Sequence, residues 1–363
     1  MDLDSIRLDM DNDPESVLRE FLSGRRTMIC GLIPDANSYC SMAGNTNEPQ
    51  EIARGQCGRV LRHSYSCALK ISHMDKEESL YNDFKMHTGV HTAFREVKAA
   101  HHMDIHVPAV NRLASTKDEG LGYQLALLTE SIEPMPYEIN EAMIKALCPT
   151  PKEGIDTFLA RPDNKHCLPR IHLSRRRFPH KERADAQSQT LRDFPLHLDE
   201  LDQLDVNAYD FAYTTGQALA VLHWKVGIDG AGLEFVLGEV LVARSEAATA
   251  LVDNLSKVGP PIHITEGRIG LWLIDFDCCQ DFTHEEEGLK RLLDAYADGY
   301  FPTPHTCDYI DARVWHYFKE AYLEISEMLI DSRMPAELIQ RIQTQKTVGE
   351  VGDVMGGLEG LSI

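Results

Sequence analysis

Apolar and polar positions recur with two different periods along this chain, and each period dominates a different region. Residues 51–71 contain a glycine turn between two candidate strands and then an apolar strand, and residues 107–110 and 123–128 are further strand candidates. Residues 80–94 carry apolar side chains at helical spacing instead. After residue 208 the helical pattern prevails, in four segments: residues 208–223, 285–296, 312–329 and 336–344. The chain therefore predicts a small β-rich region followed by a larger, mostly helical one.

Helix-start signals and prolines divide these regions further. Asp13 and Pro14 supply an N-cap and a first helical residue, so we expect a short helix that ends near Leu22. Residues 35–47 are expected to form a loop. The prolines within residues 130–136 fix φ and cannot continue a strand ladder, which indicates a stiff connector. The predicted organisation is an N-terminal extension with a short helix (1–50), a β-rich N-lobe with one helix (51–133), a mostly helical C-lobe (134–345) and a flexible tail (346–363).

The C-lobe contains a segment, residues 149–194, that we interpret as an insertion. Basic residues gather between positions 170 and 183 of this otherwise acidic chain: Arg170, Arg175, Arg176, Arg177, Lys181 and Arg183. Such a charge run is usually a solvated loop. The alternative is a lid that offsets an acidic cleft or holds an anionic group. The sequence leaves both interpretations open.

Composition limits the class of protein and its partners. Of the 363 residues, 43% are hydrophobic, which is enough to bury a full core. The formal net charge of −21 would repel phosphate backbones and anionic lipid surfaces, so we expect neither a nucleic-acid nor a membrane partner. The acidic N-terminus lacks the regions of a signal peptide and no window resembles a membrane span, so we expect a cytoplasmic location. The nine cysteines include no C-x-x-C pair, which gives a zinc finger little support.

The most informative segment is residues 271–277, an apolar strand that ends in two acidic side chains. Asp275 follows the last apolar strand residue, and Asp277 lies two positions later. A buried strand that delivers carboxylates to its end is how a kinase-like fold holds a metal ion over phosphate groups. The segment therefore predicts a site that acts on phosphates.

Residues nearer the N-terminus complete a set suited to phosphoryl transfer. The backbone amides of a turn with Gly55 and Gly58 would cover phosphate oxygens, and Lys70 on an apolar strand would neutralise them. Asp83 on the next helix is the best candidate to hold Lys70 in place, with Glu77 or Glu78 as alternatives. These positions predict a phosphate-binding face on the β-rich region.

Two further acids lie between the long helix and the acidic strand. Asp229 follows that helix in a turn, where it would accept or orient the proton of a substrate hydroxyl. Glu234 lies five residues later and would hold magnesium together with Asp275 and Asp277, because magnesium prefers oxygen ligands. In this interpretation Lys70, Asp229 and Asp275 are the catalytic residues.

These residues resemble the motifs of the protein-kinase-like superfamily, near its aminoglycoside- and choline-kinase branch, where an Ile-Asp-Phe-acid strand end is usual. The chain resembles more closely a fungal family of unknown function, the DUF3669 family. Four segments carry this second resemblance: residues 191–196, 219–224, 229–238 and 273–277. Over roughly residues 55–329, the resemblance implies a two-lobed, protein-kinase-like α+β fold with a small β-rich N-lobe and a larger, mostly helical C-lobe.

The chain departs from active kinases at several of these positions. Kinases carry His two places before the loop acid, where this chain has Gly227, and Asn five places after it, where this chain has Glu234. The glycine turn lacks the full G-x-G-x-x-G spacing, and Asp83 is one methylene shorter than the usual Glu. Without a metal, one of the carboxylates gathered in the cleft is expected to have a raised pKa. Together these departures disfavour efficient ATP chemistry.

The resemblance implies a different use of the same cleft. Members of the resembled family occur in fungi beside genes for terpenoid and polyketide metabolites. We therefore expect a repurposed enzyme of specialised metabolism that binds an apolar small molecule and catalyses a cofactor-independent cyclisation, such as an intramolecular Diels–Alder reaction. A shaped apolar pocket would hold the reacting groups together, and Lys70 or a nearby histidine would donate a hydrogen bond to a conjugated carbonyl.

The expected ligand contacts of this pocket are Gly55, Gly58, Asp83, His223 and Trp224, and no cofactor is expected. Two alternatives remain open. The first is a small-molecule phosphotransferase that depends on Mg and ATP, with Glu234, Asp275 and Asp277 as metal ligands. The second is a pseudokinase-like protein that binds a ligand and catalyses nothing.

Overall fold

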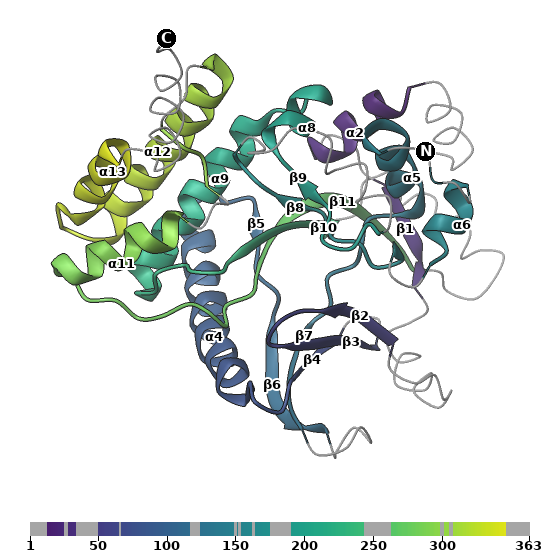
Figure 1. Ribbon diagram of the computed structural model, residues 1–363, viewed down its shortest axis with the longest axis horizontal. Coiled ribbons are helices and arrows are strands. Elements are labelled where there is room, and N and C mark those ends of the chain that lie inside the picture. The colour runs from purple at the N-terminus through teal and green to yellow at the C-terminus, as the bar shows by residue number, and fades with distance from the viewer. Residues whose placement is uncertain are drawn as a thin grey trace, which may run out of the picture.

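The computed structural model describes residues 13–24, 28–33, 50–64, 67–116, 124–148, 151, 154–161, 164–174, 190–242, 263–297, 301–304 and 308–345. Within these residues the chain is an α+β protein with two β-sheets (Figure 1). The loop expected at 35–47, most of the basic run at 170–183 and the tail at 346–363 lie outside them. None of the described helices is long and apolar enough to cross a membrane.

The described elements have the following bounds. The strands are β1 (Met28–Ile33), β2 (Gln50–Arg54), β3 (Gly58–Ser64), β4 (Cys67–Ser72), β5 (Ile105–His106), β6 (Val110–Ser115), β7 (Leu125–Glu130), β8 (Arg170–Ile171), β9 (Pro195–Leu196), β10 (Glu234–Val242) and β11 (His263–Ile274). The helices are α2 (Pro14–Leu22), α4 (Glu77–Ala100), α5 (Tyr137–Leu147), α6 (Ile155–Leu159), α8 (Leu198–Gln203), α9 (Ala208–Val221), the π-helical turn η3 (Leu222–Val226), α11 (Glu286–Ala297), α12 (Tyr309–Leu329) and α13 (Met334–Thr344).

The first sheet has five antiparallel strands in the order β2–β3–β4–β7–β6. In its central strand β4, Lys70 pairs with Val60 on one side and Leu127 on the other. Leu69 and Ile71 are fully buried in the small core of this sheet. Because strand side chains alternate between faces, Lys70 points to the opposite face, which borders a cavity.

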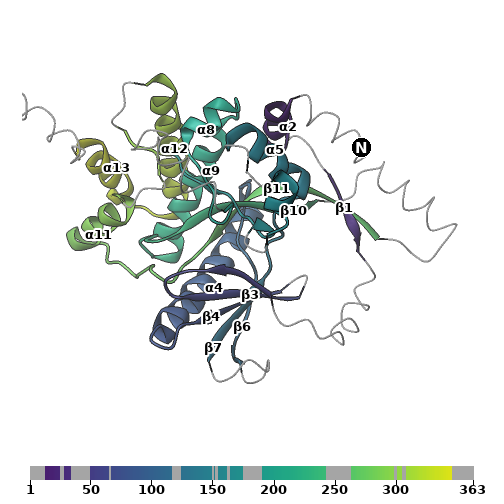
Figure 2. The ribbon, with the colours of Figure 1, turned by 45° about the vertical axis from the view of Figure 1, so that its right-hand side comes forward.

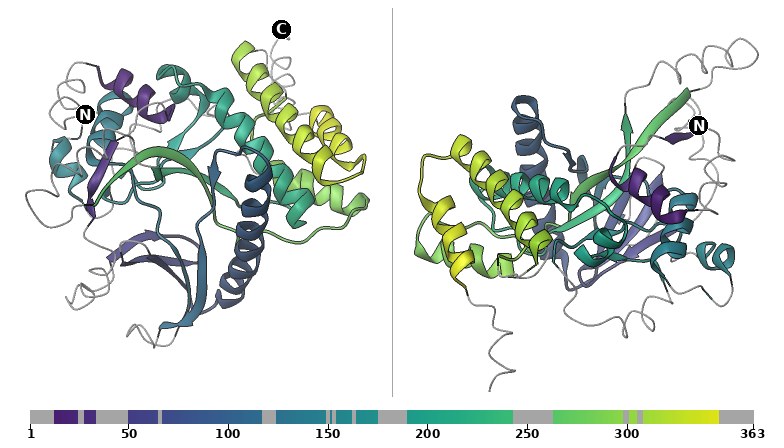
Figure 3. Two further views of the ribbon diagram at one scale, coloured as in Figure 1. Left: turned by 180° about the vertical axis from the view of Figure 1, so that it is seen from behind. Right: turned by 90° about the horizontal axis from the view of Figure 1, so that it is seen from above.

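Helix α4 follows β4 and contacts both the first sheet and the helices beyond it. Seen from behind, it lies between the first sheet and the C-terminal helices (Figure 3). The helical period predicted for residues 80–94 is confirmed, and the helix extends over Glu77–Ala100. Its buried face includes Leu80 and Val90, but also the acidic side chain of Asp83. A buried carboxylate is costly unless it is paired, so Asp83 requires a partner.

The second sheet is built around the long strand β11, in the order β1–β11–β10–β8–β9, with β5 running parallel to β11. β10 and β11 are antiparallel, with Glu234 opposite Ile274. This register brings Glu234 to the end of β11 at which Asp275 leaves the sheet. Two acids that are 41 positions apart therefore lie at the same sheet edge.

Two strands join the second sheet from parts of the chain that were expected elsewhere. β1 belongs to the predicted N-terminal extension, yet it is the antiparallel neighbour of β11 (Figure 2). β5 lies within the range predicted for the N-lobe, yet Ile105 pairs with Leu271 of β11. The two sheets are therefore linked by shared chain segments, and the domain boundaries at residues 50 and 133 stay a prediction.

The helical part of the chain packs around α9 and α12. Gly216 of α9 lies so close to α12 that an added Cβ would be 2.3 Å from the backbone oxygen of Phe318, so only glycine fits. Phe318 and Tyr322 on α12 are fully buried and share one large apolar cluster with Phe276, which follows β11. This cluster fixes the position of the acidic strand end relative to the helices.

Most predicted elements are confirmed, with local exceptions. The side chain of Asp13 caps α2 by accepting the N–H of Ser16, as predicted. The strand predicted at 107–110 is wrong, because Pro108 cannot donate to a ladder and separates β5 from β6. The helix predicted for 208–223 continues as a π-helical turn that ends at Gly227, whose φ of 86° is left-handed.

Candidate functional site

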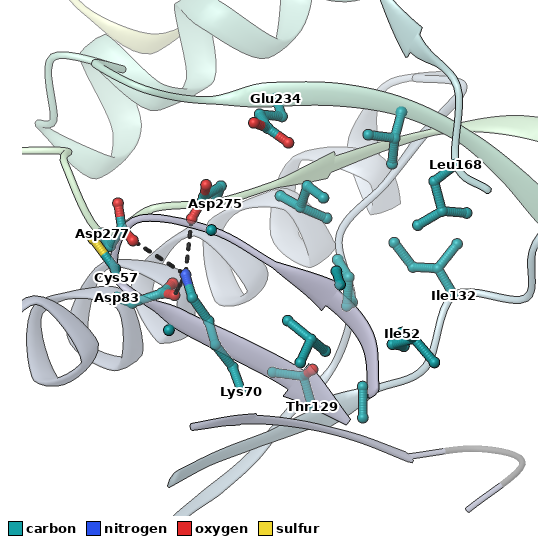
Figure 4. A pocket seen from close by; sticks show the side chains of 18 of the residues that line it. Ile52, Cys57, Lys70, Asp83, Thr129, Ile132, Leu168, Glu234, Asp275 and Asp277 are labelled. Carbon is teal, nitrogen blue, oxygen red and sulfur yellow. Dashed lines mark hydrogen bonds and ion pairs between the residues drawn. The ribbon is translucent and has the colours of Figure 1, made fainter. Parts of the chain in front are cut away.

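A cavity of about 500 Å³ lies between the two sheets, with walls from both (Figure 4). Charged side chains gather at one end, where β4, α4 and the residues after β11 meet. Aliphatic side chains line the other end, among them Ile52, Ile132 and Leu168. A concave site of this volume, apolar on one side and polar on the other, is typical of small-molecule pockets.

Lys70 is the centre of the charged end. Its Nζ lies 2.6 Å from Asp83 Oδ2, 2.8 Å from Asp275 Oδ1 and 3.2 Å from Asp277 Oδ2. Burial alone would lower the pKa of Lys70, but the three carboxylates raise it well above its usual value, so the side chain is an ammonium ion. An ammonium ion has three N–H donors, and in this structure each is directed at one aspartate.

The three aspartates reach this point from two different elements. Asp83 projects from α4, and burial raises its pKa although Lys70 opposes the shift. Burial would also raise the pKa of Asp277, but Lys70 and the thiols of Cys278 and Cys57 lower it overall. Asp275 has a left-handed backbone with φ of 66°, which is rare for a residue with a side chain. Strained conformations of this kind cluster at functional sites.

The charges at this end do not balance. Three carboxylates face one ammonium ion, and one oxygen from each of Asp83, Asp275 and Asp277 lies within 4.8 Å of the other two. Among the described residues, this is the group of acidic, histidine or cysteine side chains that could hold a metal ion. The excess negative charge favours the binding of a cation at this end of the cavity.

The predicted glycine turn borders the cavity. Gly55 donates its backbone N–H to the Gly58 carbonyl at 2.8 Å, which closes the turn between β2 and β3. Both glycines line the cavity. The two glycines differ in the space around them. An added Cβ on Gly58 would lie 2.1 Å from the Ile71 carbonyl oxygen, whereas an added Cβ on Gly55 would meet nothing within 4 Å. Gly58 is thus required by strand packing.

Glu234 lies on the wall of the cavity and is paired with a residue of the predicted insertion. Arg170 Nη1 lies 2.7 Å from Glu234 Oε1, and its Nη2 donates to Asp193 at 2.8 Å. Burial raises the pKa of Glu234 to about 7, although Arg170 opposes the shift. Glu234 therefore exchanges a proton nearer to neutral pH than an exposed glutamate does, and the residue paired with it is Arg170.

Asp229 is not among the described residues that line the cavity. Its side chain is 4% exposed, and its Oδ1 accepts the backbone N–H groups of Ala231 and Gln280 at 3.2 and 2.9 Å. The turn that carries Asp229 is thereby tied to the loop after β11. This geometry makes Asp229 a structural link between the two acidic segments.

His223 and Trp224 also lie away from the described cavity wall. Both side chains are buried in η3, and His223 Nδ1 lies 2.8 Å from the hydroxyl oxygen of Tyr322. Burial lowers the pKa of His223 to about 3, so its imidazole is neutral at physiological pH. The structure places these two residues in the helical core rather than beside Lys70.

The apolar end of the cavity was not predicted. Its aliphatic side chains come from both sheets and from the segments that join them: Ile52, Val60, Ala68, Leu127, Ile132, Leu168, Val236 and Ile274. The position of Ala68 could have been predicted from the sequence, because Ala68 lies two positions before Lys70 and therefore on the same face of the strand. The pairing that brings Val236 opposite this face required the structure.

Two cysteines at the charged end were also missed. Cys57 lies in the glycine turn and Cys278 directly follows Asp277, and both line the cavity. The carboxylate of Asp277 acts on the pKa of both thiols. Burial and this carboxylate raise the pKa of Cys57, and they raise the pKa of Cys278 to about 12.

Comparison with protein families gives a match at the acidic strand end. Residues 271–334 match the model of the DUF3669 family, which carries the description zinc finger protein. The described cysteines of this segment are Cys278 and Cys279, and the three-ligand group among the described residues is carboxylate-based. No curated protein and no solved structure matches the chain. The match at the acidic strand end supports the DUF3669 family that the sequence motifs indicated.

Proposed function

We propose that this chain is a protein-kinase-like enzyme that binds a magnesium–nucleotide in the cavity and transfers its terminal phosphoryl group to a small molecule. The observation that carries the proposal is the position of Lys70, which contacts Asp83 on a helix and Asp275 at a strand end within one cavity. A lysine held by a helix acid, opposite a strand-end aspartate, is the arrangement with which protein kinases hold nucleotide phosphates and magnesium.

The order of the parts along the chain supports a kinase-like interpretation of the two sheets. The glycine turn, Lys70 and α4 lie with the first sheet, and Glu234 and Asp275 lie at the edge of the second. The connector near Glu133 joins them, where a β-bridge pairs Glu133 with Glu239 of β10. Under this proposal the first sheet with α4 is the N-lobe.

The side chains present fit a magnesium ion. Asp275 and Asp277 would hold it, since carboxylate oxygens are the ligands that magnesium prefers and the cluster carries more negative charge than Lys70 balances. When bound, the ion would neutralise charge on the phosphate oxygens. If Asp275 and Asp277 held the ion, their ion pairs with Lys70 would weaken, and the ammonium group could then contact phosphate.

The remaining cavity suits the other parts of a nucleotide. The backbone of the turn from Gly55 to Gly58 lies on the cavity wall, where its amides can approach phosphate oxygens. Ala68 and Val60 from one sheet and Ile274 from the other border the apolar end. Aliphatic side chains on two opposed walls form a slot that accepts a planar heterocycle.

Glu234 is the acid that we assign to proton transfer, because it lines the cavity while Asp229 does not. In the reaction a substrate hydroxyl oxygen bonds to the terminal phosphorus and the bond from phosphorus to the nucleotide's bridging oxygen breaks. The hydroxyl proton passes to the carboxylate of Glu234. A group with a pKa of about 7 is suited to accept a proton at neutral pH.

Calorimetric titration of the purified chain with Mg²⁺ and ATP or ADP tests the proposal. We expect saturable binding that is lost in Lys70→Met and in Asp275→Asn. Lys85→Met is the matched control, because Lys85 also projects from α4 and pairs with Asp281 but does not line the cavity. Absence of binding to the wild-type chain at millimolar nucleotide would overturn the proposal.

A second candidate is the cofactor-independent cyclisation of an apolar precursor, and the apolar end of the cavity favours it. Lys70 is not suited to donate to a substrate carbonyl, because its three N–H groups are directed at aspartates. Protonated Glu234 would be the donor instead. Metabolite profiling of a gene deletion tests this candidate: accumulation of an uncyclised precursor supports it, and an unchanged profile contradicts it.

A further inference from the structure

One side chain on α4 holds the segment that carries the acidic residues after β11. Residues 275–280 leave the sheet without forming a helix or a strand, so their backbone carbonyl groups need partners from elsewhere. The side-chain amide of Asn82 donates to the carbonyl of Asp277 at 3.0 Å and to the carbonyl of Cys279 at 2.9 Å. Both N–H groups of one amide are therefore used on this segment, 195 and 197 positions away in the chain.

The same segment is anchored to the core directly before Asp277. Phe276 is fully buried in the large apolar cluster, and its ring packs against the ring of His87 on α4, with centroids 4.7 Å apart. The backbone of Asp277 is thus fixed by a buried ring on one side and by Asn82 at its own carbonyl. With the backbone fixed, the side-chain dihedrals alone direct the carboxylate of Asp277.

Asn82 lies next to the charged end of the cavity without lining it, among the residues that the structure describes. Its neighbour on α4, Asp83, contacts Lys70 Nζ at 2.6 Å, and the same Nζ lies 3.2 Å from Asp277 Oδ2. Two consecutive helix residues therefore act on one acidic site, Asp83 through its charge and Asn82 through the backbone of a ligand. Groups that orient a metal ligand in this way contribute to metal affinity although they do not touch the ion.

We propose that Asn82 is a positioning residue for Asp277, which it holds in the orientation required to bind a divalent cation. The inference rests on the proposed function, in which Asp275 and Asp277 are the ligands of magnesium. Asn82 contacts neither the ion nor the nucleotide, and it acts through the two carbonyl groups that it binds. Its removal should therefore weaken metal binding while both carboxylate ligands stay in the chain.

Titration with Mn²⁺ alone tests this role, because Mn²⁺ takes the same oxygen ligands as magnesium and the free ion is measured by electron paramagnetic resonance. We expect about tenfold weaker Mn²⁺ binding in Asn82→Leu, since leucine is similar in size to asparagine but donates no hydrogen bond. Asn82→Gln keeps the amide and should recover part of the affinity. Such a rescue distinguishes the hydrogen bonds from simple packing.

Lys85→Met is the matched control for these titrations. Lys85 lies three positions further along α4 and also pairs with the chain after β11, at Asp281, but this ion pair is exposed. Its loss should leave the Mn²⁺ affinity within about twofold of the wild-type value, because an exposed pair contributes little. Thermal melting without metal checks that each variant is folded. If Asn82→Leu melts early, Asn82→Ala provides the same comparison.

Amide hydrogen exchange of the metal-free chain gives a second readout. The N–H of Cys279 is bound by the Phe276 carbonyl and the N–H of Gln280 by Asp229, so their exchange rates report opening of the segment. Loss of the two Asn82 hydrogen bonds should speed this exchange about tenfold in Asn82→Leu, with α12 unchanged. Lys85→Met should exchange at the wild-type rate.

Each outcome bears on the inference separately from the proposed function. Wild-type Mn²⁺ affinity in Asn82→Leu, or equal loss in Lys85→Met, overturns the inference and leaves the proposed function in place. If the wild-type chain binds no Mn²⁺, the proposed function is contradicted, and amide exchange then decides the role of Asn82. Unchanged exchange at Cys279 and Gln280 in Asn82→Leu overturns the inference, whereas faster exchange there supports Asn82 as the residue that holds Asp277.

Discussion

Lys70 Nζ lies 2.8 Å from Asp275 Oδ1, although the two residues are 205 positions apart in the chain. The contact links the first sheet to the end of the second and defines the charged end of the cavity. Asp275 reaches it with a left-handed backbone, at φ of 66°. A left-handed backbone at a residue with a side chain is costly, and such conformations cluster at functional sites.

Removal of the Lys70 charge should destabilise the chain in a pH-dependent manner. Lys70→Met leaves three buried or half-buried aspartates without their cation, which should lower the free energy of unfolding by about 3–5 kcal/mol at pH 8. The loss should shrink as the pH falls and as Mg²⁺ is added, because protons and the cation both remove the repulsion. Urea unfolding at several pH values measures this. A loss that is the same at every pH and Mg²⁺ concentration would contradict the charge assignment.

The two glycines of the turn should differ sharply in their tolerance of alanine. Gly58→Ala should lower the free energy of unfolding by about 1–3 kcal/mol, because its Cβ would lie 2.1 Å from the backbone oxygen of Ile71. Gly55→Ala should change it by less than about 0.5 kcal/mol, since nothing lies within 4 Å of the added atom. Thermal or chemical denaturation of the two variants provides the comparison, and equal effects would show that the turn is packed differently.

Asp229 should behave as a structural residue. Asp229→Ala leaves the N–H groups of Ala231 and Gln280 without their acceptor, which should cost about 2 kcal/mol of stability. Asp229→Asn keeps an acceptor oxygen and should be nearly as stable as the wild type, with nucleotide affinity unchanged. Chemical denaturation and calorimetry of both variants measure these effects. If the asparagine variant is stable but catalytically dead, Asp229 is the base and our assignment of Glu234 is wrong.

Acid should destabilise the chain through its buried histidines, of which His223 is the clearest case. The folded chain holds the pKa of His223 at about 3, whereas the unfolded chain protonates it near 6.5. Stability from this residue is therefore complete above pH 6.5 and falls by about 1.4 kcal/mol per pH unit below it, until the folded pKa is reached. His87, His106 and His166, each with a pKa of about 4, add to the same trend.

The variant His223→Phe measures how much of this acid sensitivity comes from His223. It should be less stable at neutral pH, because it removes the contact to the hydroxyl of Tyr322. Its unfolding free energy should nevertheless decline more slowly between pH 6.5 and 4 than that of the wild type. Urea denaturation across this range gives the two slopes, and parallel slopes would mean that His223 is protonated in the folded chain.

Local patterns in the sequence predicted the elements that carry the charged end of the cavity. The apolar period of residues 80–94 gave α4, and the apolar strand before Asp275 gave the end of β11. Lys70, Asp83, Asp275 and Asp277 were singled out from residue type and order, and the structure brings all four together. The helix and the strand end could be predicted because the periodic spacing of apolar residues within each segment is visible in the sequence.

Features that depend on long-range pairing were not predictable in the same way. Nothing local to residues 28–33 indicates that β1 is the neighbour of β11. The salt bridge from Arg170 to Glu234 depends on the pairing of β8 with β10, so the sequence did not indicate that this predicted metal ligand is paired with an arginine. Asp229 leaves the cavity because backbone N–H groups bind its side chain, and such contacts have no signature in residue order.

A crystal structure of the chain with Mn²⁺ and ADP would show whether the cavity binds a metal–nucleotide. We expect an anomalous manganese peak in contact with Asp275 and Asp277, phosphates beside Lys70 and the turn at Gly55, and the base among the aliphatic side chains at the other end of the cavity. A cavity that stays free of nucleotide and manganese at saturating concentrations would contradict the proposed function.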